Sequence, residues 1–155
     1  MIKIANQKYY VVLFLAVSLL IMLFQFQFFY GGYFGYDDIE YIKLEKDVIF
    51  GTYKLDENLY SYRWTVVFPL SGLYKVFGIN DFSNFIFNVI PRLLIVYFTI
   101  KLINNYSLST KLITVLFISF LPTHLSYLEK PMPDVWIELG FLLCFSAYYG
   151  LKYLQ

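Results

Sequence analysis

The chain has little charge, one cysteine and one histidine, and these shortages exclude several classes of protein. Charged residues make up only 15% of the 155 residues, against about 25% in an ordinary soluble domain. The formal net charge of +1 provides no basic stripe that could follow a phosphate backbone, which argues against nucleic acid as a partner. Cys144 has no second cysteine for an intramolecular disulfide, and His124 has no neighbouring histidine or cysteine to complete a zinc site.

In place of charge, the sequence has apolar and aromatic residues that are gathered in blocks. Hydrophobic residues form 59% of the chain and aromatic residues 23%, which indicates an integral membrane protein. We expect an all-α membrane protein in which residues 1–155 form one unit of about four transmembrane helices. The expected transmembrane helices are Tyr9–Tyr30, Phe85–Ile103, Leu108–Leu121 and Val135–Tyr153. The first is too long for a cleaved signal peptide, and no small-residue cleavage site follows it.

The distribution of lysines predicts how the helices are oriented. Five lysines fall on one side of the membrane if the four helices alternate in direction: Lys3, Lys8, Lys101, Lys111 and Lys152. Because lysine and arginine mark cytoplasmic loops, we expect a multi-pass protein of the plasma membrane with both termini in the cytoplasm. The loops Gly31–Asp81 and Pro122–Asp134 then lie on the outer side.

The first outer loop contains signals for two short helices. One helix is expected after Asp37 or Asp38, either of which can cap it, and Gly51 ends it. This helix carries the isoleucines Ile39, Ile42 and Ile49. A second helix is expected to begin near Pro69 and to stop at Gly78. Short amphipathic helices rich in aromatic residues usually lie in the plane of the membrane interface.

Three aspartates fall at the outer ends of the expected transmembrane helices. Asp37 and Asp38 follow the first helix, and Asp134 directly precedes the fourth. Carboxylates at the mouth of apolar segments are unfavourable unless they hold water, a cation or a substrate, so this placement indicates chemistry at a membrane surface. The alternative is that Asp38 and Asp134 serve only as helix N-caps.

Cationic residues accompany these acids. Arg92 lies inside the second expected helix, where a lone charge is unfavourable by roughly 2.5 to 3.5 kcal/mol on insertion scales. It must therefore face protein, water or lipid phosphate: it binds the phosphate of a lipid carrier, pairs with the loop acids, or extends outward to the interface. Arg63, and Lys130 beside Glu129, are candidates for the same electrostatic role, with simple contacts to water or headgroups as the alternative.

The order of these features resembles that of a known superfamily. The series consists of one apolar helix, Gly-Tyr-Asp37-Asp38-Ile-Glu-Tyr41, Tyr62-Arg63 leading into Phe68-Pro69-Leu70, Val76-Phe77-Gly78-Ile79-Asn80, Arg92, and Leu121-Pro122 through to Asp134. It resembles the amino-terminal part of a C-type (GT-C) glycosyltransferase, in particular the protein O-mannosyltransferases and the lipid A aminoarabinose transferases. The resemblance covers nearly the whole chain.

The resemblance implies a reaction and a set of site residues. A sugar would pass from a polyprenyl-phosphate carrier to an acceptor glycan, lipid or protein outside the cytoplasm, and no nucleotide-sugar motif is then expected. The catalytic acids would be Asp37, Asp38 and Asp134, with aspartate at the second position where the family often has glutamate. Ionised Asp37 could act as the general base while Asp134 orients the acceptor. The expected substrate-binding residues are Tyr41, which could stack on a sugar ring, Arg63, Arg92, Glu129 and Lys130.

Metal dependence and completeness stay open at this point. Some relatives hold a divalent metal at the acids, and oxygen ligands from Asp37 and Asp134 would suit magnesium or manganese. Members of the superfamily have roughly twice as many transmembrane helices, so we expect the chain to be the amino-terminal part of a larger fold or to be completed by a second chain. Two other classes are a noncatalytic membrane subunit, with the acids as helix caps, and a transporter fragment, with Arg92 as a pathway charge.

Overall fold

The computed structural model describes residues 2–29, 36–55, 59–121, 130–131 and 133–153, and these residues are arranged as helices and short connections. The elements are α1 (Ile2–Phe29), α2 (Tyr36–Phe50), the 3-10 helix η1 (Leu59–Tyr62), α3 (Trp64–Phe77), α4 (Asp81–Leu102), α5 (Leu108–Ser119) and α7 (Asp134–Tyr153). No strand occurs in these ranges, which confirms the expected all-α class for the part of the chain described.

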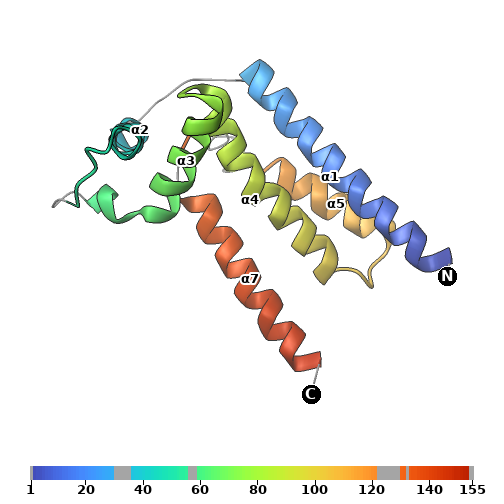
Figure 1. Cartoon of the computed structure of the whole chain (residues 1–155). Helices are drawn as coiled ribbons and strands as arrows, with labels where there is room; N and C mark the ends of the chain where they lie inside the picture. The colour runs from blue at the N-terminus through green and yellow to red at the C-terminus, as the bar shows by residue number, and fades with distance from the viewer. Residues whose placement is uncertain (1, 30–35, 56–58, 122–129, 132, 154–155) are drawn as a thin grey trace.

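The helices form two parts (Figure 1). The bundle consists of α1, α4, α5 and α7, and the α2–α3 unit, formed by α2, η1 and α3, lies at one end of it. Helix α4 connects the parts, because it contacts α1, α3, α5 and α7. We call the end beside α2 and α3 the acidic end, where Asp81 and Asp134 begin helices, and the opposite end the lysine end, after Lys101 and Lys111.

Within the part of the chain that the structure describes, two helices are long and apolar enough to cross a membrane, judged by length and composition: Tyr9–Phe29 and Asp81–Leu102. They correspond to the first two expected transmembrane helices. Helix α5 has 12 residues and at 1.5 Å per residue reaches about 18 Å, short of a hydrocarbon core of about 30 Å. The expected spans Leu108–Leu121 and Val135–Tyr153, and the four-helix orientation, therefore remain predictions.

Glycines end α2 and α3, as the sequence predicts. Gly51 has φ +73° and Gly78 has φ +86°, values in the left-handed region that favours glycine. Helix α4 begins immediately afterwards, because the Asn80 side chain accepts a hydrogen bond from the Ser83 backbone N–H at 3.0 Å. Ser107 caps the start of α5 in the same way.

Helix α3 begins earlier than expected. The proline signal placed its start near Pro69, but the helix starts at Trp64 and contains Pro69 in its interior. Proline removes one backbone donor there, yet the helix continues through it because one face is buried. The buried residues of α3 are Val66, Val67, Leu70, Ser71 and Tyr74. Tertiary packing thus outweighs the local preference of proline for a helix start.

Helix α2 packs through Tyr41 and Leu44, with Ile49 against the same cluster. Ile39 is 60% exposed, whereas Tyr41 and Leu44 are buried. They belong to a cluster that we call the α2–α3 core, formed by Tyr41, Leu44, Val66, Val67, Leu70, Tyr74 and Phe87. Phe87 brings α4 into this core, and its ring centroid lies 5.3 Å from that of Trp136 in α7. The start of α7 therefore rests against the same cluster as α2.

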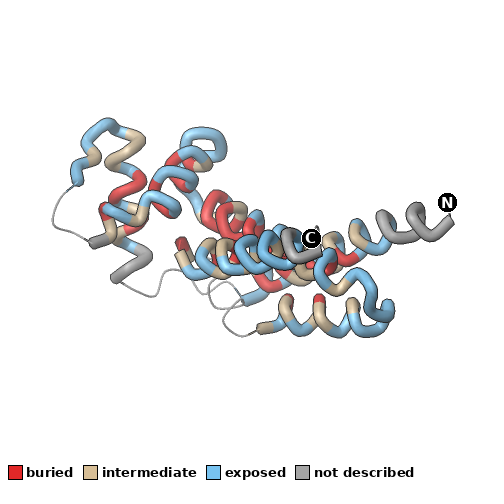
Figure 2. Tube along the Cα trace, turned by 90° about the horizontal axis from the view of Figure 1, so that it is seen from below, coloured by how far each residue is buried: buried red, intermediate tan, exposed pale blue. Residues whose placement is uncertain are grey.

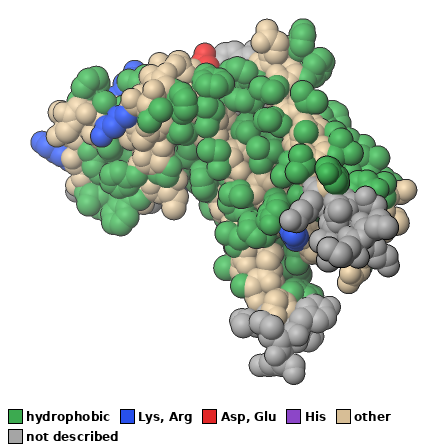
Figure 3. Space-filling view, turned by 45° about the vertical axis from the view of Figure 1, so that its right-hand side comes forward, with side chains coloured by type: hydrophobic (Ala, Val, Ile, Leu, Met, Phe, Trp, Pro, Cys, Tyr) green, Lys and Arg blue, Asp and Glu red, His purple; other side chains and the backbone are tan. Residues whose placement is uncertain are grey.

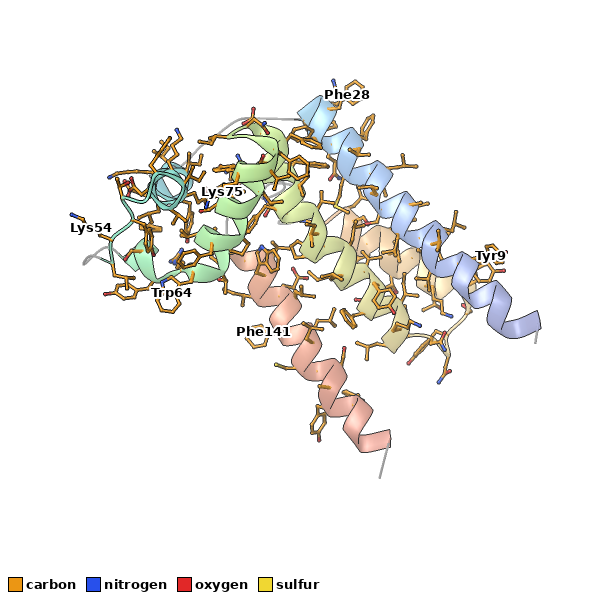
Figure 4. All side chains as sticks on the ribbon, viewed as in Figure 1. Tyr9, Phe28, Lys54, Trp64, Lys75 and Phe141 are labelled. Carbon is orange, nitrogen blue, oxygen red and sulfur yellow. The ribbon has the colours of Figure 1, made fainter. Side chains whose placement is uncertain are left out.

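The bundle turns apolar side chains outward. In the apolar segment of α1 that is long enough to cross a membrane, only 22% of the residues are buried, against 50% in that of α4. Buried residues concentrate along α4 and between α2 and α3 (Figure 2). Hydrophobic side chains cover most of the visible bundle surface, whereas lysine and arginine gather over the α2–α3 unit (Figure 3). Phe28 of α1 and Phe141 of α7 point away from the bundle (Figure 4). The outer surface of the bundle thus suits an apolar environment.

Candidate functional site

The expected catalytic aspartates fall in the first turns of two helices. Asp37 and Asp38 belong to the first turn of α2, and their side chains lie outside the part of the structure described. Asp134 is the first residue of α7 and is exposed, and the Trp136 backbone N–H bonds to the Pro133 carbonyl. A helix start carries positive partial charge, so aspartates are favoured there with or without a catalytic role.

Both acidic segments border the α2–α3 core. Tyr41 lies about one helical turn beyond the pair Asp37 and Asp38, and it belongs to this core. Trp136 lies two residues beyond Asp134 and packs against the same core. Residues close to both acidic helix starts therefore pack against one core.

Tyr41 is a packing residue. It exposes none of its surface, and its hydroxyl accepts a hydrogen bond from Nη1 of Arg63. Its ring meets that of Tyr60 edge-on, with centroids 5.3 Å apart. A ring enclosed in this way offers no open face to a sugar, so the expected stacking role of Tyr41 does not fit the structure. The reason is the orientation of α2 about its own axis, which turns Tyr41 into the α2–α3 core.

Arg63 is held between two tyrosine rings. Its guanidinium carbon lies 5.7 Å from the Tyr41 ring centroid and 5.0 Å from that of Tyr60. Contacts of this kind stabilise a cation over an aromatic face. Arg63 also occupies the N-cap position of α3 and is half-buried. The structure thus fixes a positive charge beside the α2–α3 core, where an anion could be attracted.

Helix α4 carries a buried polar stripe formed by Asn84, Asn88 and Arg92. The three residues are four positions apart and therefore lie on one face of the helix. Asn84 accepts a hydrogen bond from the Tyr74 hydroxyl at 2.7 Å. Asn88 donates one to the Lys130 carbonyl, also at 2.7 Å. The stripe consequently runs from the α2–α3 core, past the segment that precedes α7, into the bundle.

Arg92 is the last residue of the polar stripe along α4. It is only 5% exposed, so it does not extend outward to the interface as one alternative required. The negative charge of Glu138 in α7 attracts its guanidinium group. Its Nε has no hydrogen-bond acceptor among the described residues. A buried cation with an unused donor is suited to an anionic group or to water.

The remaining expected site residues are placed only in part. Glu129 lies outside the described residues, and its expected role stays a prediction. Lys130 is half-buried, and its carbonyl connects the segment before α7 to α4 through Asn88. Among the described residues, no three histidine, cysteine or acidic side chains form a group that could hold a metal. The side chains of Asp37 and Asp38 lie outside the described part of the structure, so magnesium or manganese binding also stays a prediction.

Glu45 is a buried acid that the sequence interpretation missed. It is 0% exposed, and neither carboxyl oxygen has a hydrogen-bond partner among the described residues. Burial raises the pKa of Glu45 well above its ordinary value, and the neighbouring Tyr74 hydroxyl opposes this change to a smaller extent without forming a hydrogen bond of normal geometry. The available signal was the spacing of Tyr41, Leu44 and Val48, which places Glu45 on the same apolar face.

No family model, no curated protein and no solved structure matches the chain. The resemblance to the GT-C superfamily therefore depends on the order of motifs in the sequence. The residues that bear on function are the polar stripe of α4, which ends at Arg92, and Arg63 beside the Tyr41 ring.

Proposed function

We propose that the chain is the amino-terminal part of a membrane glycosyltransferase of the GT-C type, which moves a sugar from a polyprenyl-phosphate carrier to an acceptor outside the cytoplasm. The observation that carries this proposal is the common position of the two acidic helix starts. Support comes from Tyr41, one turn beyond Asp37, and Trp136, two residues beyond Asp134, which meet at one core, and from the polar stripe on α4 that includes Arg92.

The proposed reaction uses the acids and the cations in different steps. The acceptor hydroxyl oxygen bonds to the anomeric carbon, and the bond from that carbon to the carrier phosphate breaks. The phosphate leaves with the electron pair, and the hydroxyl proton passes to Asp37 as general base, with Asp38 beside it. Asp134 orients the acceptor. Positive charge from Arg92 or Arg63 stabilises the departing phosphate.

The proposed arrangement in the membrane follows from the distribution of apolar and charged surface. Helices α1, α4 and α7 and the segment Leu108–Leu121, which contains α5, cross the plasma membrane; the lysine end faces the cytoplasm, and the acidic end faces outward. Support comes from the outward apolar side chains of the bundle and from Lys101 and Lys111 at the lysine end. A larger protein or a second chain would complete the cavity around the carrier.

The test is sugar transfer by membranes that contain the protein. Radiolabelled polyprenyl-phosphate sugars are supplied to the wild type and to Asp37→Asn, and loss of a general base is expected to slow transfer by about 10²- to 10⁴-fold. Asp134→Asn is expected to slow it less. The matched control is Asp81→Asn, which changes an acid in the first turn of α4 at the same end and should leave transfer unchanged. Wild-type rates for both Asp37→Asn and Asp134→Asn would contradict the proposal.

A noncatalytic membrane subunit is the second candidate. The observation in its favour is that Asp37, Asp38 and Asp134 all lie in first turns, where helix electrostatics alone favours an acid. In that case the asparagine variants lower the thermal midpoint of unfolding, and no labelled sugar is transferred by the wild type from any donor supplied.

A further inference from the structure

A groove lies at the lysine end, away from the acidic segments. It runs between the C-terminal halves of α4 and α7 beside the turn that leads to α5. Two adjoining cavities of about 400 Å³ and about 640 Å³ share Leu102, Asn105 and Tyr149 as lining residues. Cavities of about 300 to 1,000 Å³ are typical of sites for small organic ligands. The groove is therefore large enough to hold part of a lipid.

The groove has a polar part and an apolar part. Its polar part is formed by side chains from α4, the following turn and α7: Lys101, Asn104, Asn105 and Ser146. Its apolar part includes Leu102, Leu142 and Phe145. Ser146 lines the polar part of the groove, although its Oγ is enclosed by protein atoms and has no hydrogen-bond partner among the described residues.

The surroundings of the groove are positively charged. The sequence contains no aspartate or glutamate in residues 1–36, 82–128 or 139–155, which include the helix termini at the lysine end. Those ranges contain five lysines, at the positions Lys3, Lys8, Lys101, Lys111 and Lys152. Lys101 lines the groove, and its ammonium nitrogen lies 5.6 Å from the Tyr97 ring centroid. An anionic ligand is therefore favoured over a neutral or cationic one.

We propose that this groove binds an anionic phospholipid, with its phosphate beside Lys101 and Ser146 and one acyl chain against Leu142 and Phe145. A lipid fits better than a soluble anion because the apolar wall continues onto outward-facing side chains of α7. Phe145 lines the groove and is nevertheless 52% exposed. The groove also adjoins the C-terminal end of a helix apolar enough to cross a membrane. This inference is independent of the proposed glycosyltransferase reaction.

The experiment measures lipid retained by the purified full chain. Native mass spectrometry counts the phosphatidylglycerol molecules that stay bound after transfer from nanodiscs, with phosphatidylcholine nanodiscs for comparison. The variant Lys101→Gln removes one positive charge near the anionic headgroup. It is expected to retain phosphatidylglycerol about fivefold more weakly than the wild type. Ser146→Leu fills the groove and should reduce retention further. Lys54→Gln is the matched control, because Lys54 is an exposed lysine of the α2–α3 unit.

Each outcome decides for or against the lipid site. Lower retention in Lys101→Gln and Ser146→Leu but not in Lys54→Gln, with unchanged helix content by circular dichroism, supports it. Equal retention of phosphatidylglycerol and phosphatidylcholine by the wild type overturns the role of the anionic headgroup. Equal loss in all three variants, or in none, overturns the placement of the lipid in this groove.

Discussion

The α2–α3 unit and the helix bundle place polar and apolar residues in opposite ways. The unit buries a hydrophobic core and exposes lysines: Lys43, Lys46, Lys54 and Lys75. The bundle exposes large apolar side chains and buries polar ones, among them Ser18, Asn88, Arg92 and Ser119. Ser18 and Ser119 join α1 to α5 by a hydrogen bond of 3.1 Å. This difference indicates water around much of the unit and lipid around the bundle.

Helix α3 stands between these two patterns. Its inner face belongs to the α2–α3 core, and its outer face is also apolar, with Trp64, Phe68 and Val76 between 48% and 73% exposed. A helix that is apolar on both faces needs two apolar environments. The arrangement suits a helix in the plane of the membrane interface, with one face on protein and the other on lipid.

The largest expected effect comes from breaking the shared core. Phe87→Ala removes a ring that is 0% exposed and is expected to lower the free energy of unfolding by about 3 to 5 kcal/mol. Phe141→Ala, at a ring that is 73% exposed on α7, should change it by less than about 0.5 kcal/mol. Chemical unfolding in mild detergent measures both. Equal losses in the two variants would contradict the distinction between inner and outer faces.

An intermediate effect is expected from placing a charge on the outer surface of the bundle. Leu20→Arg changes a residue that is 65% exposed in α1, and it should make membrane insertion of this helix less favourable by about 3 kcal/mol. Leu55→Arg changes a leucine that is 55% exposed in the α2–α3 unit, and little effect is expected. Glycosylation mapping of insertion efficiency compares the two. Unchanged insertion of Leu20→Arg would show that water, and not lipid, surrounds α1.

The smallest effect concerns Glu45 and depends on pH. Its pKa is raised by burial, so its contribution to stability is complete below the ordinary value of 4.5 and is lost as the pH rises toward the raised value. In that window the stability of the wild type should fall with a slope of at most about 1.4 kcal/mol per pH unit. Glu45→Gln should remove this fall, as measured by thermal midpoints across the window.

The control for this change is another glutamate of α2. Glu40→Gln alters a half-buried acid on the same helix and should keep the fall in stability with rising pH. A wild-type profile that is flat above pH 4.5, or one that persists in Glu45→Gln, would assign the pH dependence elsewhere.

The sequence predicted where the helices lie along the chain better than which side chains they bury. Gly51 and Gly78 gave the ends of α2 and α3 because only glycine readily adopts the backbone angles found there. The start of α3 was missed because Pro69 is tolerated inside a helix whose packing stabilises it. The burial of Tyr41 was not predicted, because its partners Tyr60 and Arg63 come from a later segment of the chain.

The candidate site was predictable in its placement and not in its contacts. The chain order predicted that the segments after Asp37 and Asp134 meet, and residues just beyond them, Tyr41 and Trp136, do pack at one core. The burial of Tyr41 and the polar stripe on α4 depend on the rotation of helices about their own axes. Local periodicity does not fix that rotation when several faces of a helix are apolar.

The contact between Phe87 and Trp136 has a consequence for how the two acidic segments are spaced. Phe87 belongs to the α2–α3 core and also contacts Trp136, so one ring on α4 lies between the core of α2 and the start of α7. A change in the volume of this ring should therefore alter the distance between the two helix starts.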